Sequence, residues 1–275
     1  MQVTFYGVRG SIASPGPDTV RYGGNTPCLR VDNGSDEIII LDAGTGIRRL
    51  GDELAGDHRP IYLLLSHQHW DHIQGFPFFK PAYRGSSEIF VVCFNCESHE
   101  NLSLTQQFSD PFFPVPASAL PSNIHLLDEE GIRDVNFQGT IVTTAPLNHP
   151  GGGSAYFFRS GGKSLAYMTD NELFPPNEPP TSYEEWVERC HGLDCLIHDA
   201  SYTDEEIETR IGWGHSSIGQ ALQLGLDAGV KLLVLFHHEP DRTDDQLDEI
   251  VAECQEKVGD SMKVIAAREG ETLTL

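Results

Sequence analysis

The chain has 275 residues, of which 39% are hydrophobic and 21% charged, a composition typical of globular proteins with a buried core. Its 18 basic and 41 acidic residues give a net charge of −23, which argues against a long nucleic-acid partner because such partners bind to basic surfaces. A small anionic substrate held by metal ions is compatible with this charge. No apolar run has transmembrane length and we find no secretory signal, so we expect a cytoplasmic protein without membrane association.

Six cysteines are too few for a disulfide scaffold, and in a cytoplasmic protein we expect reduced thiols. Two of them form CFNC at positions 93–96, but no second pair follows at the spacing of a zinc ribbon. Buried thiols therefore explain this motif better than a separate metal site does.

Ten apolar runs predict strands. In chain order they are VTFYG, EIIILDAG, PIYLLLSH, EIFVVC, NIHLL, TIVTTAPL, AYFFR, SLAYMTD, CLIHDA and KLLVLFHH. Helical patterns cover 45–55, 181–191, 217–229 and 243–257, and Ser216 or Ser217 and Thr243 are the expected N-caps of the last two. No repeat or linker divides the chain, so we expect a single α/β domain over residues 1–275 with helices covering central sheets.

The strongest chemical signal is SHQHWDH, in which His67, His69, Asp71 and His72 follow an apolar strand. In an extended segment residues i and i+2 point the same way, so His67 and His69 can hold one metal ion. Asp71 and His72 would then face a neighbouring ion. Imidazole and carboxylate ligands suit zinc, with manganese or iron as alternatives. A polar loop of merely hydrogen-bonded histidines is a poor explanation for four such residues in six positions.

Further histidines and aspartates end later apolar runs, namely His149 in NHP, Asp170 in MTD, and His237 and His238 in FHH. Each is weak alone, since a polar residue after a strand usually belongs to a turn. Together with SHQHWDH they give the pattern HxHxDH, followed along the chain by a histidine, an aspartate and a histidine. This order resembles the metallo-β-lactamase-fold metallohydrolases over nearly the whole chain, and LDAGTG, which contains Asp42, resembles their first motif.

The resemblance implies a four-layer αβ/βα sandwich with the active site at one edge of its two sheets. It implies two sets of zinc ligands and one bridging carboxylate: His67, His69 and His149; Asp71, His72 and His237; and Asp170 between them. Asp42 would lie beneath the site and orient the ligands. His238, Arg9 and Asn25 are weaker candidates for contacts with ligands or substrate, and ordinary polar loops explain Arg9 and Asn25 equally well.

Three features favour the phosphodiesterase branch, which includes tRNA 3′-end endonucleases and phosphodiesterases of cyclic nucleotides and of a cyclic ribose phosphate. Asp170 stands where β-lactamases lack a bridging aspartate, and His69 stands where flavodiiron reductases have an acidic ligand. LIHDASYTDEE and GWGHSS resemble two motifs of this branch. The resemblance implies that His215 protonates the leaving alkoxide and that Asp199 orients His215. A turn followed by a helix cap is the structural alternative to a catalytic role for GHSS. For His198, in LIHDA, a hydrogen bond in the core is at least as good an explanation as a role in catalysis.

The implied mechanism is attack of metal-activated water on phosphorus, with Asp170 and Asp71 counted among the catalytic residues. Asp170 follows His149 by only 21 positions, too few for the long basic arm of bacterial tRNA endonucleases of this type. We therefore expect a small phosphodiester as substrate, with a 3′,5′-cyclic nucleotide as the leading candidate. The alternatives are a metal-dependent thioesterase or lactonase and a tRNA 3′-end endonuclease. Relatives in this branch are commonly dimers, which favours a homodimer.

Overall fold

The chain folds around two β-sheets, and the computed structural model describes residues 1–94, 103–127, 137 and 139–275. Within these residues the first sheet has the strand order β13-β1-β2-β3-β4-β5-β6. Its strands are β1 (Gln2–Gly7), β2 (Cys28–Asp32), β3 (Ile38–Leu41), β4 (Ile61–Leu65), β5 (Glu88–Cys93), β6 (Asn123–Leu127) and β13 (Thr272–Thr274). The second sheet has the order β12-β11-β10-β9-β8-β7. Its strands are β7 (Ile141–Pro146), β8 (Ser154–Ser160), β9 (Lys163–Met168), β10 (Cys195–Asp199), β11 (Leu232–Phe236) and β12 (Lys263–Ala266).

Parallel pairing brings the C-terminal ends of several strands to a common edge. In the first sheet β3 pairs in parallel with β4, and β4 with β5. In the second sheet β9, β10, β11 and β12 are parallel neighbours. Residues that follow these strands therefore gather at their carboxyl ends, which is where open α/β sheets bind ligands.

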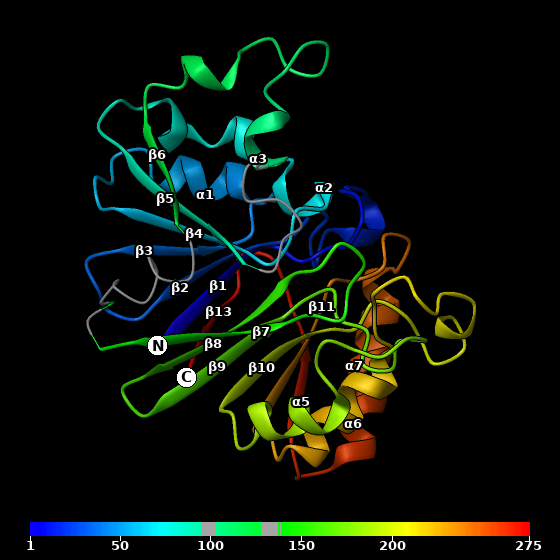
Figure 1. Cartoon of the computed structure of the whole chain (residues 1–275). Helices are drawn as coiled ribbons and strands as arrows, with labels where there is room; N and C mark the ends of the chain where they lie inside the picture. Colours follow the sequence, from blue (N-terminus) through cyan, green and yellow to red (C-terminus); the bar gives the residue numbers. More distant parts are fainter. Residues whose placement is uncertain (95–102, 128–136, 138) are drawn as a thin grey trace.

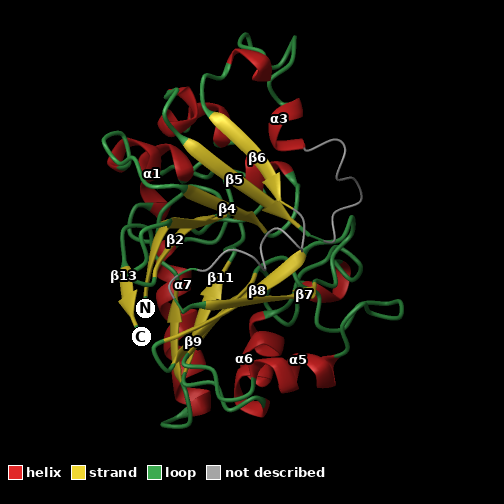
Figure 2. Cartoon of the chain, turned by 60° about the vertical axis from the view of Figure 1, so that its left-hand side comes forward, coloured by secondary structure: helices red, strands yellow, loops and turns green. Residues whose placement is uncertain are grey.

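Both faces of the central strands are buried, because the two sheets pack against each other and helices cover their outer sides (Figure 2). In β3, Ile39 and Leu41 point inward and join Phe236 of the second sheet in one apolar cluster. Ile38, with the opposite orientation, packs with Leu50 of α1 (Ile47–Glu53) in a second cluster. Side chains alternate across a strand, so an all-apolar strand serves two cores. The four-layer sandwich implied by the resemblance is confirmed.

The helices match the expected segments to within two residues at each end. The three longest helices among the described residues are α5 (Tyr183–Cys190), α6 (Ile218–Asp227) and α7 (Asp244–Val258). They contribute to the cluster on the outer face of the second sheet (Figure 1). Ser217 and Thr243 are N-caps with complete capping boxes, so Ser217 rather than Ser216 starts α6. The shorter helical segments are α2 (Trp70–Ile73), α3 (Ser103–Gln106), η1 (Pro17–Thr19), η2 (Phe76–Phe78), η3 (Lys80–Tyr83), η4 (Ala117–Ala119) and η5 (Ile207–Thr209).

All ten expected strands are present, and β2, β12 and β13 are additional. β13 has only three residues, and β2 and β12 carry charged residues within their sequences CLRVD and KVIA. Among the helices that the structure describes, none is long and apolar enough to cross a bilayer.

The expectation of free thiols holds for four buried cysteines, which are Cys28, Cys190, Cys195 and Cys254. It is wrong for Cys93, which is disulfide-bonded, and the rest of the CFNC motif beyond Phe94 lies outside the described residues.

Candidate active site

The ends of five strands supply the centre of the site. Asp42 follows β3, His67 lies two residues after β4, Asp170 two residues after β9, Asp199 ends β10 and His237 follows β11. Three of these residues have left-handed backbone conformations, with φ of 60° at Asp42, 50° at Asp170 and 61° at His237. Such conformations are uncommon for residues other than glycine and concentrate at functional sites. They turn the chain sharply where each strand ends.

Asp71, His72, Asp170 and His237 present four ligand atoms at nearly equal separations. His72 Nε2 lies 3.3 Å from Asp71 Oδ2, 3.1 Å from Asp170 Oδ2 and 3.3 Å from His237 Nε2. His237 Nε2 lies 3.2 Å from Asp71 Oδ2 and 3.3 Å from Asp170 Oδ2. A tetrahedral zinc ion with bonds of about 2.0–2.1 Å separates its ligand atoms by about 3.3 Å. The four side chains therefore fit a single divalent ion.

His67, His69 and His149 form a second group of candidate ligands beside the first. His69 Nδ1 lies 2.9 Å from His149 Nε2. His67 Nε2 is buried without a hydrogen-bond partner among the described residues and lies 3.8 Å from Asp170 Oδ1. A buried nitrogen without a partner is costly unless something else binds it. Asp170 thus directs one carboxylate oxygen at each group, which is the arrangement that a bridging ligand requires.

The second nitrogen of each ring fixes its tautomer. His72 Nδ1 lies 2.8 Å from the carboxylate of Asp42, and His149 Nδ1 lies 2.9 Å from the carbonyl oxygen of Gly214. These oxygens only accept hydrogen bonds, so each Nδ1 carries the proton and donates it. His237 Nδ1 lies 3.1 Å from Ser201 Oγ, whose own proton goes to the carbonyl oxygen of His237. When these rings are neutral, Nε2 of His72, His149 and His237 is the nitrogen with the free lone pair, as metal-binding histidines require.

The charges of the site also suit a cation. Burial lowers the pKa of His149 to about 4 and that of His67 well below its usual range, which keeps both rings neutral. Burial also lowers the pKa of His72, but the carboxylates of Asp71 and Asp170 outweigh it and raise that pKa well above normal. Asp170 in turn has a pKa well below its usual range, because the histidines around it outweigh the effect of burial. The centre concentrates negative charge that a cation would neutralise.

His215 lies beside this centre and is paired with Asp199. Its Nδ1–H donates to Asp199 Oδ2 at 2.8 Å, and its ring stacks on that of His237 with centroids 5.1 Å apart. Burial lowers the pKa of His215, but the charge and hydrogen bond of Asp199 raise it to about 9. Asp199 is fully buried and also accepts the backbone N–H groups of Asp170, Ser201 and Ser216. The carboxylate therefore holds His215 and the backbone of Asp170 in a fixed relation.

The weaker sequence candidates have other partners. Arg9 is fully buried, and its guanidinium donates to the carbonyl oxygens of Gly23, Glu239 and Arg242. Asn25 donates to Glu269 and accepts from Thr45. These contacts match the alternative explanation from the sequence, in which both residues belong to ordinary polar loops.

Two buried histidines also serve the scaffold. His238 Nε2 donates to the carbonyl oxygen of Ala267 at 2.9 Å, and burial lowers the pKa of His238 to about 3. His198 Nδ1 donates to the carbonyl oxygen of Asp199 at 2.6 Å, so it makes the core hydrogen bond that the sequence left open.

Four residues around the site carry no sequence signal. Ser66 and Tyr167 both donate to Asp42, with Tyr167 Oη 2.6 Å from Asp42 Oδ2. Ser201 orients His237, and Glu172 accepts the backbone N–H groups of two glycines that flank Trp213. Serine and tyrosine at strand ends are too common to single out, and the role of Glu172 depends on a loop 40 residues away in the chain.

Residues 38–238 of the chain match the Beta-lactamase superfamily domain. The chain belongs to this superfamily. The match begins at β3 and ends just after β11, so it contains all seven candidate metal ligands.

Known proteins similar to the chain include nucleases and other members of this fold. A Ribonuclease Z from Bacteroides fragilis is 30% identical over 105 residues, which are 35% of this chain and 33% of that protein. The chain thus matches about a third of the length of that relative. The metallo-β-lactamase-fold protein YhfI from Bacillus subtilis superposes with a TM-score of 0.70 at 16% identity, covering 99% of both chains. A diphosphatase from the PhnP family superposes with a TM-score of 0.68 at 18% identity, covering 100% of this chain and 97% of the other.

Proposed function

We propose that this protein is a metal-dependent phosphodiesterase that cleaves a small phosphodiester, with a 3′,5′-cyclic nucleotide as the leading substrate. The observation that carries this proposal is the His215–Asp199 pair beside the two ligand groups. Ester bonds with good leaving groups need no proton donor, whereas an alkoxide leaving from phosphorus does. A buried acid–carboxylate pair next to a candidate metal centre supports the second kind of chemistry.

Seven residues would hold two divalent ions in this proposal: His67, His69 and His149 on one, Asp71, His72 and His237 on the other, and Asp170 on both. Zinc is the best match for three neutral imidazoles at one position and a mixed nitrogen and oxygen set at the other. When bound, the ions would place positive charge at the phosphoryl oxygens and lower the pKa of the attacking water.

His215 would supply the proton. Because Asp199 holds Nδ1–H, Nε2 is the nitrogen that can deliver a proton to the leaving oxygen. The oxygen of the attacking water would bond to phosphorus and lose its proton to solvent. The P–O bond to the leaving oxygen would break, that oxygen would take the proton from Nε2, and Asp199 would stabilise the imidazolium before the transfer. Asp199 would act as a positioning residue, since its carboxylate reaches the reaction only through His215.

A test uses the full chain loaded with zinc or manganese and freed of excess metal. Bis(p-nitrophenyl) phosphate, cyclic AMP and cyclic GMP are assayed, and elemental analysis measures the metal content. We expect about two ions per chain, turnover of at least one diester, and loss of one ion in the variant His149→Ala. A fully loaded protein that cleaves none of these diesters would refute the proposal.

The second candidate is a tRNA 3′-end endonuclease, because the Bacteroides fragilis relative is a Ribonuclease Z. Against it stand the net charge of −23 and the β8–β9 hairpin, which fills the interval between His149 and Asp170. A precursor tRNA with a 3′ extension distinguishes the two: cleavage of this RNA at rates above those for cyclic nucleotides would favour the nuclease.

A thioesterase or lactonase is the third candidate, and it would use the same metals without an acid. It predicts that His215→Ala barely changes the rate, since a thiolate leaves readily. A homodimer and a cytoplasmic location stay predictions of the sequence.

A further inference from the structure

Two of the three tryptophans lie exposed beside the candidate ligands. Trp70 directly follows His69 and is 67% exposed, and Trp213 is 59% exposed, whereas Trp186 is fully buried. Single exposed aromatic residues are common on protein surfaces, so exposure alone does not indicate a binding site. For Trp213, however, the surrounding structure holds the backbone in place.

A buried carboxylate clamps the backbone on both sides of Trp213. Glu172 is 4% exposed, and its two oxygens accept the N–H groups of Gly212 at 2.8 Å and of Gly214 at 2.9 Å. Both glycines have left-handed backbones, with φ of 85° and 86°. Two hydrogen bonds to one buried side chain fix the backbone of the loop, while the indole stays in solvent. The indole is thus presented on a rigid support rather than left on a free loop.

The clamped loop also touches the catalytic residues. The carbonyl oxygen of Gly214 accepts from His149 Nδ1, and His215 is the next residue in the chain. A side chain at Gly214 would meet His149 Nδ1 at 2.0 Å, which shows how closely the loop packs on this ligand. At its other end the N–H of Trp213 donates to the carbonyl oxygen of Arg210 at 3.1 Å.

Arg210 is itself anchored beside the proton donor. Its guanidinium lies over the ring of Tyr202 at 4.7 Å, and the Tyr202 ring meets that of His215 edge-on at 5.7 Å. The loop is therefore fixed on both sides of the indole, and the same short segment of chain carries both Trp213 and His215.

We propose that Trp213 is a specificity-determining residue that stacks on the base of a nucleotidyl phosphodiester. This inference rests on the proposed phosphodiesterase function and adds the part of the substrate that the metal centre does not recognise. Every nucleobase has a flat face that stacks on aromatic side chains, and such stacking does not depend on charge. On a protein of net charge −23, a neutral ring is a better handle for the substrate than a further phosphate contact.

The kinetic test compares two diesters with the same leaving group, thymidine 5′-(p-nitrophenyl phosphate) and methyl p-nitrophenyl phosphate, on the metal-loaded full chain. The ratio of their kcat/KM values isolates the contribution of the base. We expect Trp213→Ala to lower this ratio by about 5- to 150-fold, mainly through KM for the thymidine substrate. Trp213→Phe, which keeps a flat ring, should restore most of the loss. Phe112→Ala removes another exposed ring, 76% exposed in the wild type, and should leave the ratio unchanged.

A binding test reads the same contact without turnover. AMP should quench the fluorescence of the metal-loaded wild type, ribose 5-phosphate should not, and Trp213→Ala should lose the quenching. If the wild type cleaves neither diester but AMP still quenches Trp213, the proposed function fails and the stacking site stands. An unchanged kinetic ratio in Trp213→Ala overturns the stacking site, as does a loss carried by Trp70→Ala instead. A change confined to oligomeric state in gel filtration, with the ratio intact, also overturns it.

Discussion

The hydroxyl of Tyr167 donates a 2.6 Å hydrogen bond to Asp42 Oδ2, the same oxygen that accepts the proton of His72 Nδ1 at 2.8 Å. Tyr167 belongs to β9 of the second sheet and Asp42 follows β3 of the first. The bond therefore crosses the interior of the sandwich and ties the second sheet to a residue that orients a candidate ligand. All three side chains are fully buried, so the bond has no competition from solvent.

Removing this hydroxyl should weaken both stability and metal binding. For Tyr167→Phe we expect a loss of about 1.5–3 kcal/mol in the free energy of unfolding, because the acceptor is a buried carboxylate. Metal affinity should fall about tenfold, as for other residues that support ligands from behind. Urea unfolding and competition with a coloured chelator measure the two effects.

Tyr156→Phe is the matched control. Tyr156 is equally buried, and its hydroxyl donates to the carbonyl oxygen of Leu65 at 2.7 Å rather than to Asp42. It should lose about 0.5–1.5 kcal/mol of stability and keep its metal affinity. Equal metal affinities in the two variants would show that Tyr167 has no influence on the ligands.

Asp199→Asn should separate poor from good leaving groups. The amide no longer stabilises an imidazolium at His215, so diesters with alkoxide leaving groups should lose about 10²- to 10⁴-fold in kcat. Diesters of p-nitrophenol, which need little acid assistance, should lose less than about tenfold. A series of leaving groups of rising pKa gives the dependence. Uniform loss across the series would mean that Asp199 only supports the fold.

Gly214→Ala should disturb His149, because the new Cβ would lie 2.0 Å from Nδ1. We expect a loss of activity above about 100-fold and a metal content reduced toward one ion, read by kinetics and elemental analysis. Gly34 is the matched control, since its φ of 82° is close to the 86° of Gly214 and its Cβ would meet nothing within 4 Å. Gly34→Ala should cost about 1 kcal/mol of stability and leave activity intact. Similar activity in both variants would contradict the close packing at Gly214.

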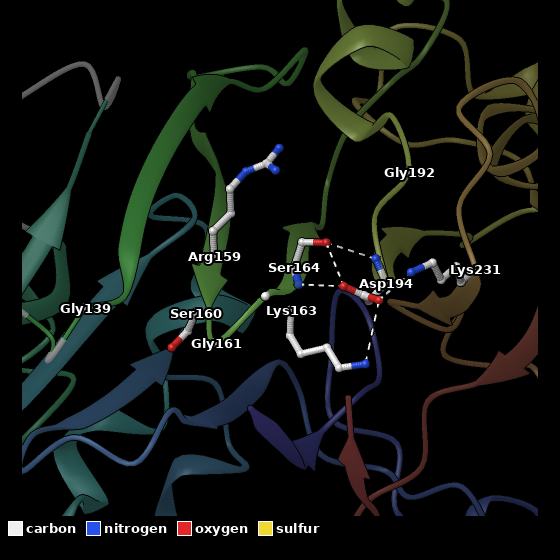
Figure 3. A pocket seen from close by; sticks show the side chains of 10 residues that line it. Gly139, Arg159, Ser160, Gly161, Lys163, Ser164, Gly192, Asp194 and Lys231 are labelled. Atoms are coloured by element: carbon white, nitrogen blue, oxygen red, sulfur yellow. Dashed lines mark hydrogen bonds and ion pairs between the residues drawn. The ribbon is translucent and has the colours of Figure 1, made fainter.

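Asp194 directly precedes β10 and should make a pH-dependent contribution to stability. Figure 3 shows it between Ser164 and Lys231. It accepts hydrogen bonds from the N–H and hydroxyl of Ser164 and from Lys231, and its pKa lies below the usual range, chiefly through Lys231. A carboxylate with a lowered folded-state pKa stabilises the fold above its unfolded pKa of about 3.9, and this stabilisation is lost as the pH falls through the folded value.

The comparison is between the wild type and Asp194→Asn in urea at pH 7, 5 and 3.5. The wild type should be more stable at pH 7 and 5, and the difference should shrink at pH 3.5. Asp260→Asn changes an exposed carboxylate and should show little difference at any of these pH values. If the difference in the free energy of unfolding between the wild type and Asp194→Asn does not vary with pH, the charge of Asp194 does not stabilise the fold.

The order of apolar runs predicted most of the strands, and the polar residues that end them predicted a metal site, whereas the division of its ligands into two sets came from the resemblance to a known family. Strands such as β3 and β11 are apolar at every position, so they can only be central strands buried on both faces. Histidines and aspartates after such strands must then lie at a sheet edge. These local patterns single out the candidate ligands along the chain, and the assignment of each ligand to one ion stays a prediction.

Only the tertiary structure decided which polar groups meet. Arg9 and His238 look equally suited to substrate from their neighbours in the sequence, but their donors are used by backbone carbonyl oxygens from distant segments. The tautomers of the ligand histidines depend on Asp42, Gly214 and Ser201, which belong to three separate parts of the chain. A hydrogen bond depends on distance and direction in space, and sequence spacing does not fix these once the partners lie on different strands.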